Sequence, residues 1–556
     1  MKIPEGKTCV NVDVIVPVHN ASETIRETVE SALHQWIPTR LSSPSGDGHA
    51  QDGEQSLNCL SNIDVDVAVC CHDDGSTDDS LKILEHIQRE LLSSPLQSAP
   101  PPEGASRRIR TRLLIGTNAD GVARGAGYAR NRATELRARN ESPTCTPTQS
   151  SASFLCMLDS DDIMHPFRIA EQLNAMMSIP DDDNRRERTL MGCTFDRIPA
   201  GSTWHYSDWA NGLSNERLLL ERYREVTLLQ PTWFLSRTRF EELGGYVEAP
   251  HPKSTDKNGC SKDTDVGKDD ADCKQSSKEG SPCRRYRLIH TKHDTPQTLR
   301  LAEDLRFFHE NLRASGLLKL HRTTTPLVTY RHRAGQSQSS STPRKLLLNL
   351  RVLAFEDTIL RRADSPWSAS DFVIWGAGRD GKDFFKSLSP DLRGRVRCFV
   401  DVDDKKIAAG FYANSDLGVR IPIVHFSLLA KNSEVRRMCI EGDVSFGKIT
   451  KGAKKEIAAA DVHTCIGVSK SKDGETSKRL INDNDSDAGA PTEAAKKRKL
   501  LRVHNLGPKD SKQLDVDSLP TLPVVVCVAM YRTNGVLERN VQSIGRVEGV
   551  DLWHFS

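Results

Sequence analysis

Phe154-Leu155-Cys156-Met157-Leu158-Asp159-Ser160-Asp161-Asp162 is the stretch of this 556-residue chain that says most about its fold. The apolar half predicts a short buried strand, and Pro166 follows soon after its end. Three carboxylates that leave a strand together repel one another unless a cation or hydrogen-bond donors compensate their charge. A divalent metal is one such compensation, and an ordinary turn rich in Asp and Ser is the alternative.

Three further strands precede this one. They are expected at 12–18, which is closed by His19-Asn20; at 65–71, which leads into Asp73-Asp74-Gly75; and at 113–115, which leads through the glycine-rich turn 121–127 into a helix at 128–139. Strand–helix alternation of this kind implies a mostly parallel sheet, and such sheets bind ligands outside the carboxyl ends of their strands. His19-Asn20, Asp73-Asp74 and the acidic cluster all follow such ends, so we expect one site there.

The order of motifs carries a resemblance. Val14 to Asn20 (VIVPVHN), Asp73 to Asp78 (DDGSTD), Gly127 to Asn131 (GYARN) and Leu158 to Asp162 (LDSDD) are followed by Pro231 to Phe234, Gly244 to Tyr246, Glu303 to Leu305 and Tyr330 to Arg333. In this order the chain resembles family 2 glycosyltransferases of the GT-A fold. The resemblance implies an α/β nucleotide-sugar-binding domain with a mostly parallel sheet over residues 10–345.

The resemblance also implies donor-site roles. Asp73 would accept a hydrogen bond from a uracil ring, with Asp74 nearby, and Asp161 would be the main ligand of Mn²⁺ or Mg²⁺. Asp159 would face the ribose or the metal and its waters, and Pro17, His19 and Asn20 would line the donor site. For Asp73 and Asp74, an Asp-Gly turn that caps the helix beginning at Ser80 is the alternative.

Asp304 is the candidate general base. Glu303-Asp304 precedes a helical apolar face (Leu305, Phe308, Leu312), so the pair lies at a helix N-terminus, where the helix dipole alone could account for the carboxylates. A single base without a nucleophile implies direct displacement with inversion, so an α-linked donor would give a β-linked product. Glu303 is its natural partner.

Four further residues are candidates on weaker patterns. Trp233 either stacks against an acceptor sugar or belongs to the core. Arg331 follows a strand at 327–330 and would bind diphosphate, and His332 would be an extra metal ligand. Arg130 either orders the donor site or packs its helix.

The C-terminal part predicts a second, smaller Rossmann-like α/β domain at 371–556, after a linker helix at 346–370. Gly376-Ala377-Gly378-Arg379-Asp380-Gly381 follows a strand and opens a helix, and the next strand ends in Asp401. This pattern is typical of dinucleotide binding, and a structural or protein-contact domain is the alternative. Segments 249–296 and 469–518 are Lys/Asp/Ser-rich and are expected to be disordered insertions.

Composition narrows the class of protein. Lys plus Arg (77) nearly balance Asp plus Glu (75), which gives no general affinity for nucleic acid. No apolar run could span a membrane, no signal pattern opens the chain, and 14 Cys lack paired CxxC spacings, so we expect a soluble cytoplasmic protein. Lys496 to Lys499 (KKRK) reads as a nuclear import signal or as a solvated charge run.

The sequence therefore predicts an inverting, metal-dependent glycosyltransferase that moves a sugar from a UDP-sugar to an acceptor hydroxyl. N-acetylglucosamine as the sugar rests on the resemblance alone, and a glycan, a protein or a small molecule all remain open as acceptor. Two alternatives belong to other classes: a sugar-phosphate nucleotidyltransferase and a non-catalytic nucleotide-binding scaffold. No Gly-rich basic loop follows the first strand to hold a triphosphate, which disfavours the nucleotidyltransferase.

Overall fold

The computed structural model describes residues 8–42, 60, 63–93, 100–140, 152–249, 294–333, 342–431, 514–528 and 535–555. The chain divides into two compact units, residues 1–362 and 363–556, and each is treated by itself. Most of the predicted insertions 249–296 and 469–518, and the basic run 496–499, lie outside the described residues.

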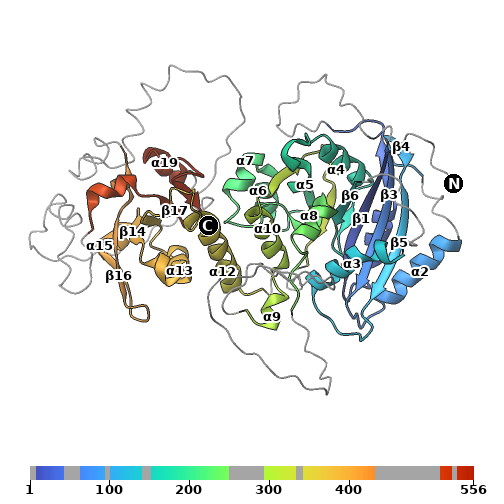
Figure 1. Ribbon diagram of the computed structural model, residues 1–556, viewed down its shortest axis with the longest axis horizontal. Coiled ribbons are helices and arrows are strands. Elements are labelled where there is room, and N and C mark those ends of the chain that lie inside the picture. Colours follow the sequence, from blue (N-terminus) through green and yellow to red (C-terminus); the bar gives the residue numbers. More distant parts are fainter. Residues whose placement is uncertain are drawn as a thin grey trace, which may run out of the picture. The chain divides into compact units, whose positions relative to one another are not determined.

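Unit 1 is built on a seven-stranded sheet. In spatial order its strands are β11 (Leu317–His321), β8 (Thr189–Cys193), β10 (Phe234–Ser236), β6 (Ser153–Met157), β1 (Thr8–Val18), β3 (Ile63–Asp73) and β5 (Arg110–Thr117). All neighbours pair in parallel except those of β10, which runs antiparallel to β6 and β8. In Figure 1 the strands β1, β3, β5 and β6 lie side by side. The predicted mostly parallel sheet is confirmed.

Helices cover both faces of this sheet, which is why its central strands are continuous apolar runs. The even-numbered valines of β1, from Val10 to Val18, pack with apolar side chains of α1 (Ile25–Leu33), α2 (Ser80–Ser93) and α4 (Arg168–Met177). The opposite face is covered by α3 (Ala126–Asn140), which contacts β1, β3 and β5.

Smaller elements complete unit 1. A three-stranded sheet has the order β7 (Ile163–Met164), β12 (Val328–Arg331) and β9 (Phe195–Ile198), and β2 (Trp36–Pro38) pairs with β4 (Ala105–Arg108). The remaining helices and helical turns are η1 (Asp182–Asn184), α5 (Arg185–Arg188), α6 (Trp204–Gly212), α7 (Asn215–Leu220), η2 (Gln230–Thr232), α8 (Arg237–Glu242), α9 (Pro296–Leu299), α10 (Glu303–Arg313), α12 (Arg344–Phe355) and the π-helical η3 (Glu356–Leu360).

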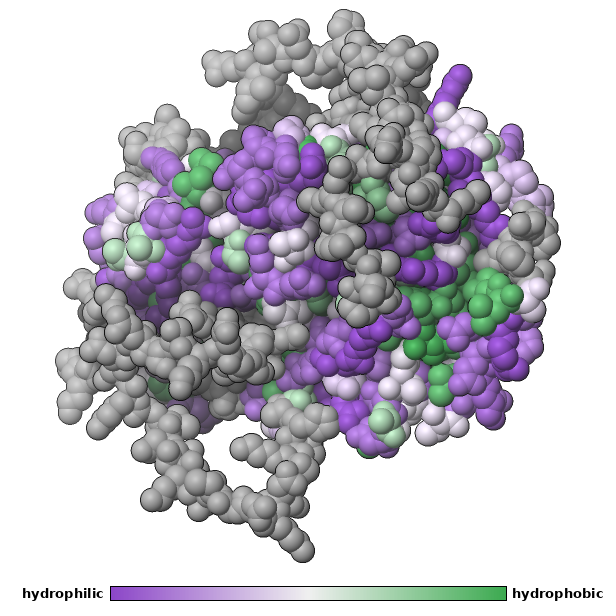
Figure 2. All heavy atoms as spheres, turned by 45° about the vertical axis from the view of Figure 1, so that its right-hand side comes forward, coloured by the Kyte–Doolittle hydropathy of each residue, from purple (hydrophilic) through white to green (hydrophobic). Residues whose placement is uncertain are grey.

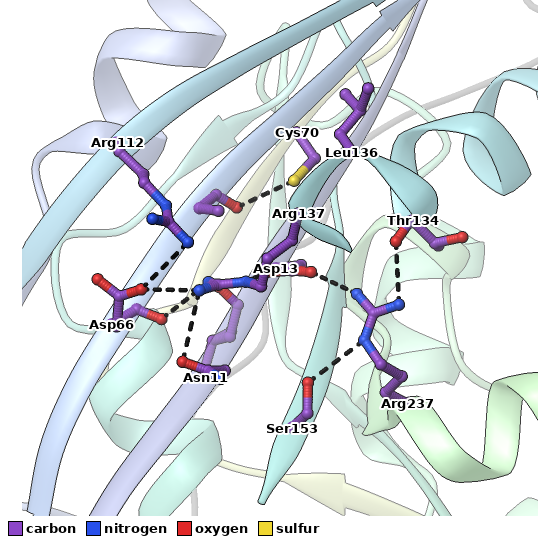
Figure 3. A network of polar contacts seen from close by, with 12 residues as sticks. Asn11, Asp13, Asp66, Cys70, Arg112, Thr134, Leu136, Arg137, Ser153 and Arg237 are labelled. Atoms are coloured by element: carbon purple, nitrogen blue, oxygen red, sulfur yellow. Dashed lines mark hydrogen bonds and ion pairs between the residues drawn. The ribbon is translucent and has the colours of Figure 1, made fainter. Parts of the chain in front are cut away.

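A buried ion network ties α3 to the sheet (Figure 3). Asp13, in the middle of β1, has no exposed surface, and it pairs with Arg137 of α3 and Arg237 of α8. Arg137 also donates from Nη1 to Oδ2 of Asp66 on β3, at 2.7 Å. A charge buried this deeply is tolerated only when it is paired and hydrogen-bonded, so the network fixes where α3 lies on β1 and β3.

Unit 2 is a second, smaller α/β unit. Its sheet has the order β15 (Phe411–Asn414), β16 (Val419–His425), β14 (Val396–Asp401), β13 (Phe372–Trp375), β17 (Val524–Val526) and β18 (Leu552–His554). Of these described strands, only β15 runs antiparallel to its neighbour. Its helices and helical turns are α13 (Arg379–Ser387), α14 (Pro390–Arg393), α15 (Asp404–Ala408), η4 (Phe426–Leu429), η6 (Val516–Thr521) and α19 (Val536–Ser543). The predicted second parallel sheet is confirmed.

The described surface is mostly polar, and most of the described cysteines are buried. On the face drawn in Figure 2 the described residues are largely hydrophilic, and the most extensive group of hydrophobic side chains lies at the right of the view. Seven cysteines lie in the described ranges, and six of them are buried. Among the described helices, none combines the length and the apolar character that a bilayer crossing requires.

Candidate active site

Three carboxylates converge at the end of β6. The side chains of Asp159, Asp161 and Asp162 each offer an oxygen, and these oxygens lie within 4.8 Å of one another. The loop that carries them is held from behind, because the Ser160 carbonyl accepts hydrogen bonds at 3.0 Å from the hydroxyls of both Thr24 and Thr28. The backbone is thereby fixed against α1 while the acidic side chains come together.

This cluster fits a divalent cation. Burial, and then the neighbouring Asp159, raise the pKa of Asp161 to about 6, and burial raises the pKa of Asp162 well above its usual range. Oδ2 of Asp162 is buried and has no hydrogen-bond partner among the described residues. An all-oxygen donor set with an unsatisfied buried carboxylate oxygen suits Mg²⁺ or Mn²⁺. Asp162 was not among the ligands expected from the sequence, although it stood in the same motif.

Arg130 bridges the acidic loop and α10. Its Nη2 donates to Oδ1 of Asp159 at 2.6 Å, and its Nη1 donates to Oε1 of Glu303 at 2.7 Å. The guanidinium is buried, and its Cζ lies 5.6 Å from the centre of the Tyr246 ring. Gly127 lets α3 come this close to α10, since a Cβ at position 127 would lie 3.3 Å from Cβ of Glu303. Arg130 therefore compensates two carboxylates from distant parts of the chain.

Asp304 is half-buried in the first turn of α10, and its Oδ1 accepts a hydrogen bond from the Leu305 amide at 2.7 Å. Burial, and then the charge of Glu303, raise the pKa of Asp304 to about 7. The preceding Ala302 has φ +55°, a left-handed conformation that is costly for a residue with a Cβ. A carboxylate that titrates near neutral pH suits proton transfer from a hydroxyl.

The ends of β1 and β3 meet, as the parallel sheet predicts. Val18 is in register with Asp73, Nδ1 of His19 lies 3.0 Å from the Asp74 carbonyl, and Oδ1 of Asn20 accepts from the Thr77 amide at 2.8 Å. Pro17 is buried in β1, beyond the last residue of β1 that pairs with β6, where its missing N–H breaks no bond to that strand.

Asp73 and Asp74 have different surroundings. Oδ2 of Asp73 accepts from the Ser76 amide at 3.2 Å, but its Oδ1 is buried without a partner in the described chain, as an acceptor for a ligand N–H would be. Asp74 is saturated: its carboxylate accepts from the side chain of Asn118 and from the amides of Arg124 and Gly125. Asp74 thus holds the glycine-rich turn against β3.

The cap of the helix that begins at Ser80 is not Asp73 or Asp74 but a different aspartate. Asp78, and not Asp73 or Asp74, accepts the Ser80 amide at the start of α2, at 3.0 Å. Burial opposes ionisation of Asp78, but hydrogen bonds from Ser80 and Ser22 outweigh it and lower its pKa to about 2.

Arg331, the last residue of β12, and Arg333, two residues beyond it, border the acidic loop. Arg331 donates its backbone amide to Oδ1 of Asp162 and its Nε to the Asp161 carbonyl, both at 2.9 Å. Nε of Arg333 lies 3.7 Å from Oδ2 of Asp161. His332 donates its amide to the Ile198 carbonyl, and its ring is not among the described groups that could share a metal with the three aspartates.

Trp233 has no exposed surface, which agrees with core packing and not with stacking on an acceptor sugar. Its Nε1 donates to the Leu228 carbonyl at 2.8 Å, and its ring lies 5.8 Å from that of Phe307. A side chain without accessible surface cannot stack on a sugar, so we assign Trp233 to the core.

In unit 2 the glycine-rich loop is tightly packed. A Cβ on Gly381 would lie 1.9 Å from the Gly376 carbonyl oxygen, so α13 approaches the loop closely. Asp401 already has four partners: its carboxylate accepts from the amides of Ala377, Val402 and Asp403 and from Nζ of Lys406. A ribose would have to displace these donors from Asp401.

The comparisons with known proteins give only distant likenesses. No protein-family model matches the chain. A crystal structure of S. aureus TarS 1-349 in complex with UDP-GlcNAc is similar at 14% identity and a TM-score of 0.32, over 69% of this chain and 72% of that one. A second structure of S. aureus TarS is similar at 13% identity and a TM-score of 0.31, over 70% of this chain and 51% of that one.

The mannosyltransferase PcManGT from Pyrobaculum calidifontis, in complex with GDP-Man and Mn²⁺, is similar at 13% identity and a TM-score of 0.29. The likeness covers 63% of this chain and 64% of that one. Likenesses this weak carry no functional conclusion for the chain, and its fold class follows from the sheet topology.

Proposed function

We propose that this chain is a metal-dependent, inverting glycosyltransferase that uses a UDP-sugar, with N-acetylglucosamine as the sugar. The observation that carries the proposal is the three-carboxylate cluster at the carboxyl end of a mostly parallel sheet, where Asp73 ends another strand and Arg130 links Asp159 to Glu303, next to Asp304. The finer likeness to beta-1,3-N-acetylglucosaminyltransferase-like protein 1 rests on sequence alone, in Ile374–Gly378, Phe399–Asp403 and Trp553–Ser556.

Each residue has a role in this reaction. Oδ1 of Asp73 accepts a hydrogen bond from the base of the nucleotide, since it is a buried acceptor without a partner among the described residues. Asp159, Asp161 and Asp162 would hold Mn²⁺ or Mg²⁺, which when bound would offset the negative charge of the diphosphate. Arg130 keeps Asp159 and Glu303 in place.

Asp304 supplies the proton chemistry. Its carboxylate takes the proton of the acceptor hydroxyl while the hydroxyl oxygen bonds to the anomeric carbon and the bond from that carbon to the diphosphate breaks. A pKa near 7 leaves a large fraction of Asp304 ionised at neutral pH and still basic enough to accept a proton. Because Asp304 acts as base and no nucleophile is assigned, the anomeric configuration inverts.

The test is a donor screen with Mn²⁺. We expect release of nucleoside diphosphate from UDP-N-acetylglucosamine, faster than from UDP-glucose, UDP-galactose or GDP-mannose, and a β-configured sugar by NMR. Pyrophosphate release from UTP and a sugar phosphate would favour a nucleotidyltransferase instead. Nucleotide binding without turnover of any donor would favour a scaffold.

A further inference from the structure

Arg197 is a half-buried cation with unused hydrogen-bond donors. It lies on β9, and its Nε donates to Oγ of Ser207 on α6 at 2.8 Å. No carboxylate in the described ranges forms an ion pair with Arg197, and neither of its terminal nitrogens has a hydrogen-bond partner there. The buried arginines Arg130 and Arg137, by contrast, each pair with two carboxylates.

Aromatic rings hold the guanidinium in place. Its Cζ lies 4.6 Å from the ring centre of Tyr330, 5.4 Å from that of Tyr206 and 5.5 Å from that of Phe195. Cation–π contacts of this kind orient an arginine without neutralising its charge. Burial lowers the pKa of Arg197, and the nearby Tyr330, Tyr206 and Asp162 oppose this shift.

Arg197 lies beside the proposed reaction centre. It is in register with Tyr330 of β12, and the next residue, Arg331, donates its amide to Oδ1 of Asp162 at 2.9 Å. On the other side, Oη of Tyr206 donates to the Val226 carbonyl, next to Glu225. Burial, and then the charges of Glu225 and, more weakly, Asp304, raise the pKa of Tyr206, so Asp304 is within electrostatic reach of the same ring.

The position favours the acceptor over the donor. The proposed nucleotide residues follow β1 and β3, whereas Arg197 belongs to the sheet β7-β12-β9, which starts directly after Asp162. Arg331 and Arg333 already stand at the acidic loop where a diphosphate would bind. Tyr330, Tyr206 and Ser207 around Arg197 offer the aromatic and hydroxyl groups that suit a sugar or polyol.

We propose that Arg197 binds a phosphate or carboxylate on the acceptor, so that the acceptor is an anionic sugar or polyol. The inference rests on the proposed transferase function and adds the chemical class of its second substrate. A bidentate, charge-assisted hydrogen-bond pair from the guanidinium should make an anionic acceptor bind roughly 10- to 100-fold more tightly than its neutral counterpart.

The test uses matched pairs of small acceptors on the full chain. Methyl glucuronide against methyl glucoside reports a carboxylate, and glycerol 3-phosphate against glycerol reports a phosphate. Binding is titrated calorimetrically with and without UDP and Mn²⁺, so the selectivity of Arg197 is measured even if UDP does not bind. Failure of UDP to bind would count against the transferase function, and the anion preference would be decided separately.

We expect wild-type protein to prefer the anionic member of at least one pair, and Arg197→Met to abolish that preference with the Kd for UDP unchanged. Arg197→Lys should retain part of it, which separates lost charge from lost folding. Arg420→Met is the control: it removes an arginine of unit 2 whose Cζ lies 3.5 Å from the centre of the Phe411 ring, and it should leave the anion preference unchanged. Equal binding within both pairs, a preference that survives Arg197→Met, or weakened UDP binding in that variant would overturn the proposal.

Discussion

The carboxylate of Asp304 differs from a surface aspartate in its surroundings. It is half-buried and follows Glu303 directly, and these two causes raise its pKa to about 7. A carboxylate near that pKa is a useful base, and its position at the N-terminus of α10 does not explain the shift, because a helix dipole would lower the pKa. The residue therefore has a testable signature in kinetics and another in stability.

Asp304→Asn keeps the size of the side chain and removes its basicity. We expect sugar transfer to fall by roughly 10²- to 10⁴-fold, in kcat more than in donor KM, since the carboxylate acts on the acceptor proton in the transition state. In the wild type, kcat/KM should rise with pH and level off above about 7, and the variant should lose this limb. Normal transfer by Asp304→Asn with an inactive Glu303→Gln would move the base to Glu303.

Asp304→Asn should increase the stability of the fold although it lowers activity. A carboxylate whose pKa is raised by folding stabilises the fold below its unfolded pKa, and that stability is lost as pH rises through about 7. Metal-free Asp304→Asn should therefore be more stable than wild type above pH 7, by between about 1 and 4 kcal/mol, and the difference should vanish near pH 4. Thermal melts across pH 4–8 measure this, and a difference independent of pH would contradict the assigned shift.

At the scale of elements, α3 carries Arg130 to the acidic loop, and the buried network around Asp13 anchors that helix. Asp13 has no exposed surface and pairs with Arg137 and Arg237, so Asp13→Asn leaves two arginines short of a counter-charge. We expect a loss of about 3–5 kcal/mol in the free energy of unfolding. Asp64→Asn is the matched control, because its pair with Arg107 is longer (3.9 Å) and partly exposed, and it should cost under about 1 kcal/mol. Equal losses in urea titrations would refute the anchoring role.

The positions of the strand ends could be predicted from the sequence, but contacts between distant elements could not. Strand–helix alternation was enough to predict that His19, Asp73 and Asp159 follow neighbouring strand ends, because parallel strands end at one edge. The contact between Arg130 and Glu303 joins residues 173 positions apart, so no local pattern could predict it. The short strand β9 pairs with β12, and the paired residues Arg197 and Tyr330 are 133 positions apart, so the surroundings of Arg197 could not be predicted from a local pattern either.

Local patterns leave the roles of some side chains undecided. For Trp233 the sequence allows both acceptor stacking and core packing, and the complete burial of the side chain favours the core. The sequence places Asp73 and Asp74 together at the donor site, and only the structure shows that the Asp74 carboxylate accepts from Asn118, Arg124 and Gly125. Oδ1 of Asp73, by contrast, has no partner among the described residues. Hydrogen-bond satisfaction distinguishes such neighbours, and it becomes visible only when the loops are placed.

At the scale of the whole molecule, the chain combines two parallel-sheet units, of which one holds the proposed reaction. In unit 2, burial would raise the pKa of Asp401, but hydrogen bonds from Asp403, Lys406 and Ala377 outweigh it and lower the pKa. This favours a structural role for the loop Gly376–Gly381. We expect NAD and NADP to leave the melting temperature unchanged, and Asp401→Asn to lower it at pH 7. Stabilisation by either dinucleotide, lost in Gly378→Val, would show a dinucleotide site instead.

The central claim is that the acidic loop 159–162 binds a divalent metal together with a nucleoside diphosphate. Calorimetric titration of UDP into the full chain, with Mn²⁺ and then with EDTA, tests it most directly. We predict that UDP binds with Mn²⁺, that EDTA weakens binding at least tenfold, and that Asp161→Asn in Mn²⁺ binds as weakly as wild type in EDTA. Asp182→Asn, at an exposed aspartate outside the cluster, should bind UDP as wild type does. UDP binding that is unaffected by EDTA and by Asp161→Asn would contradict the account.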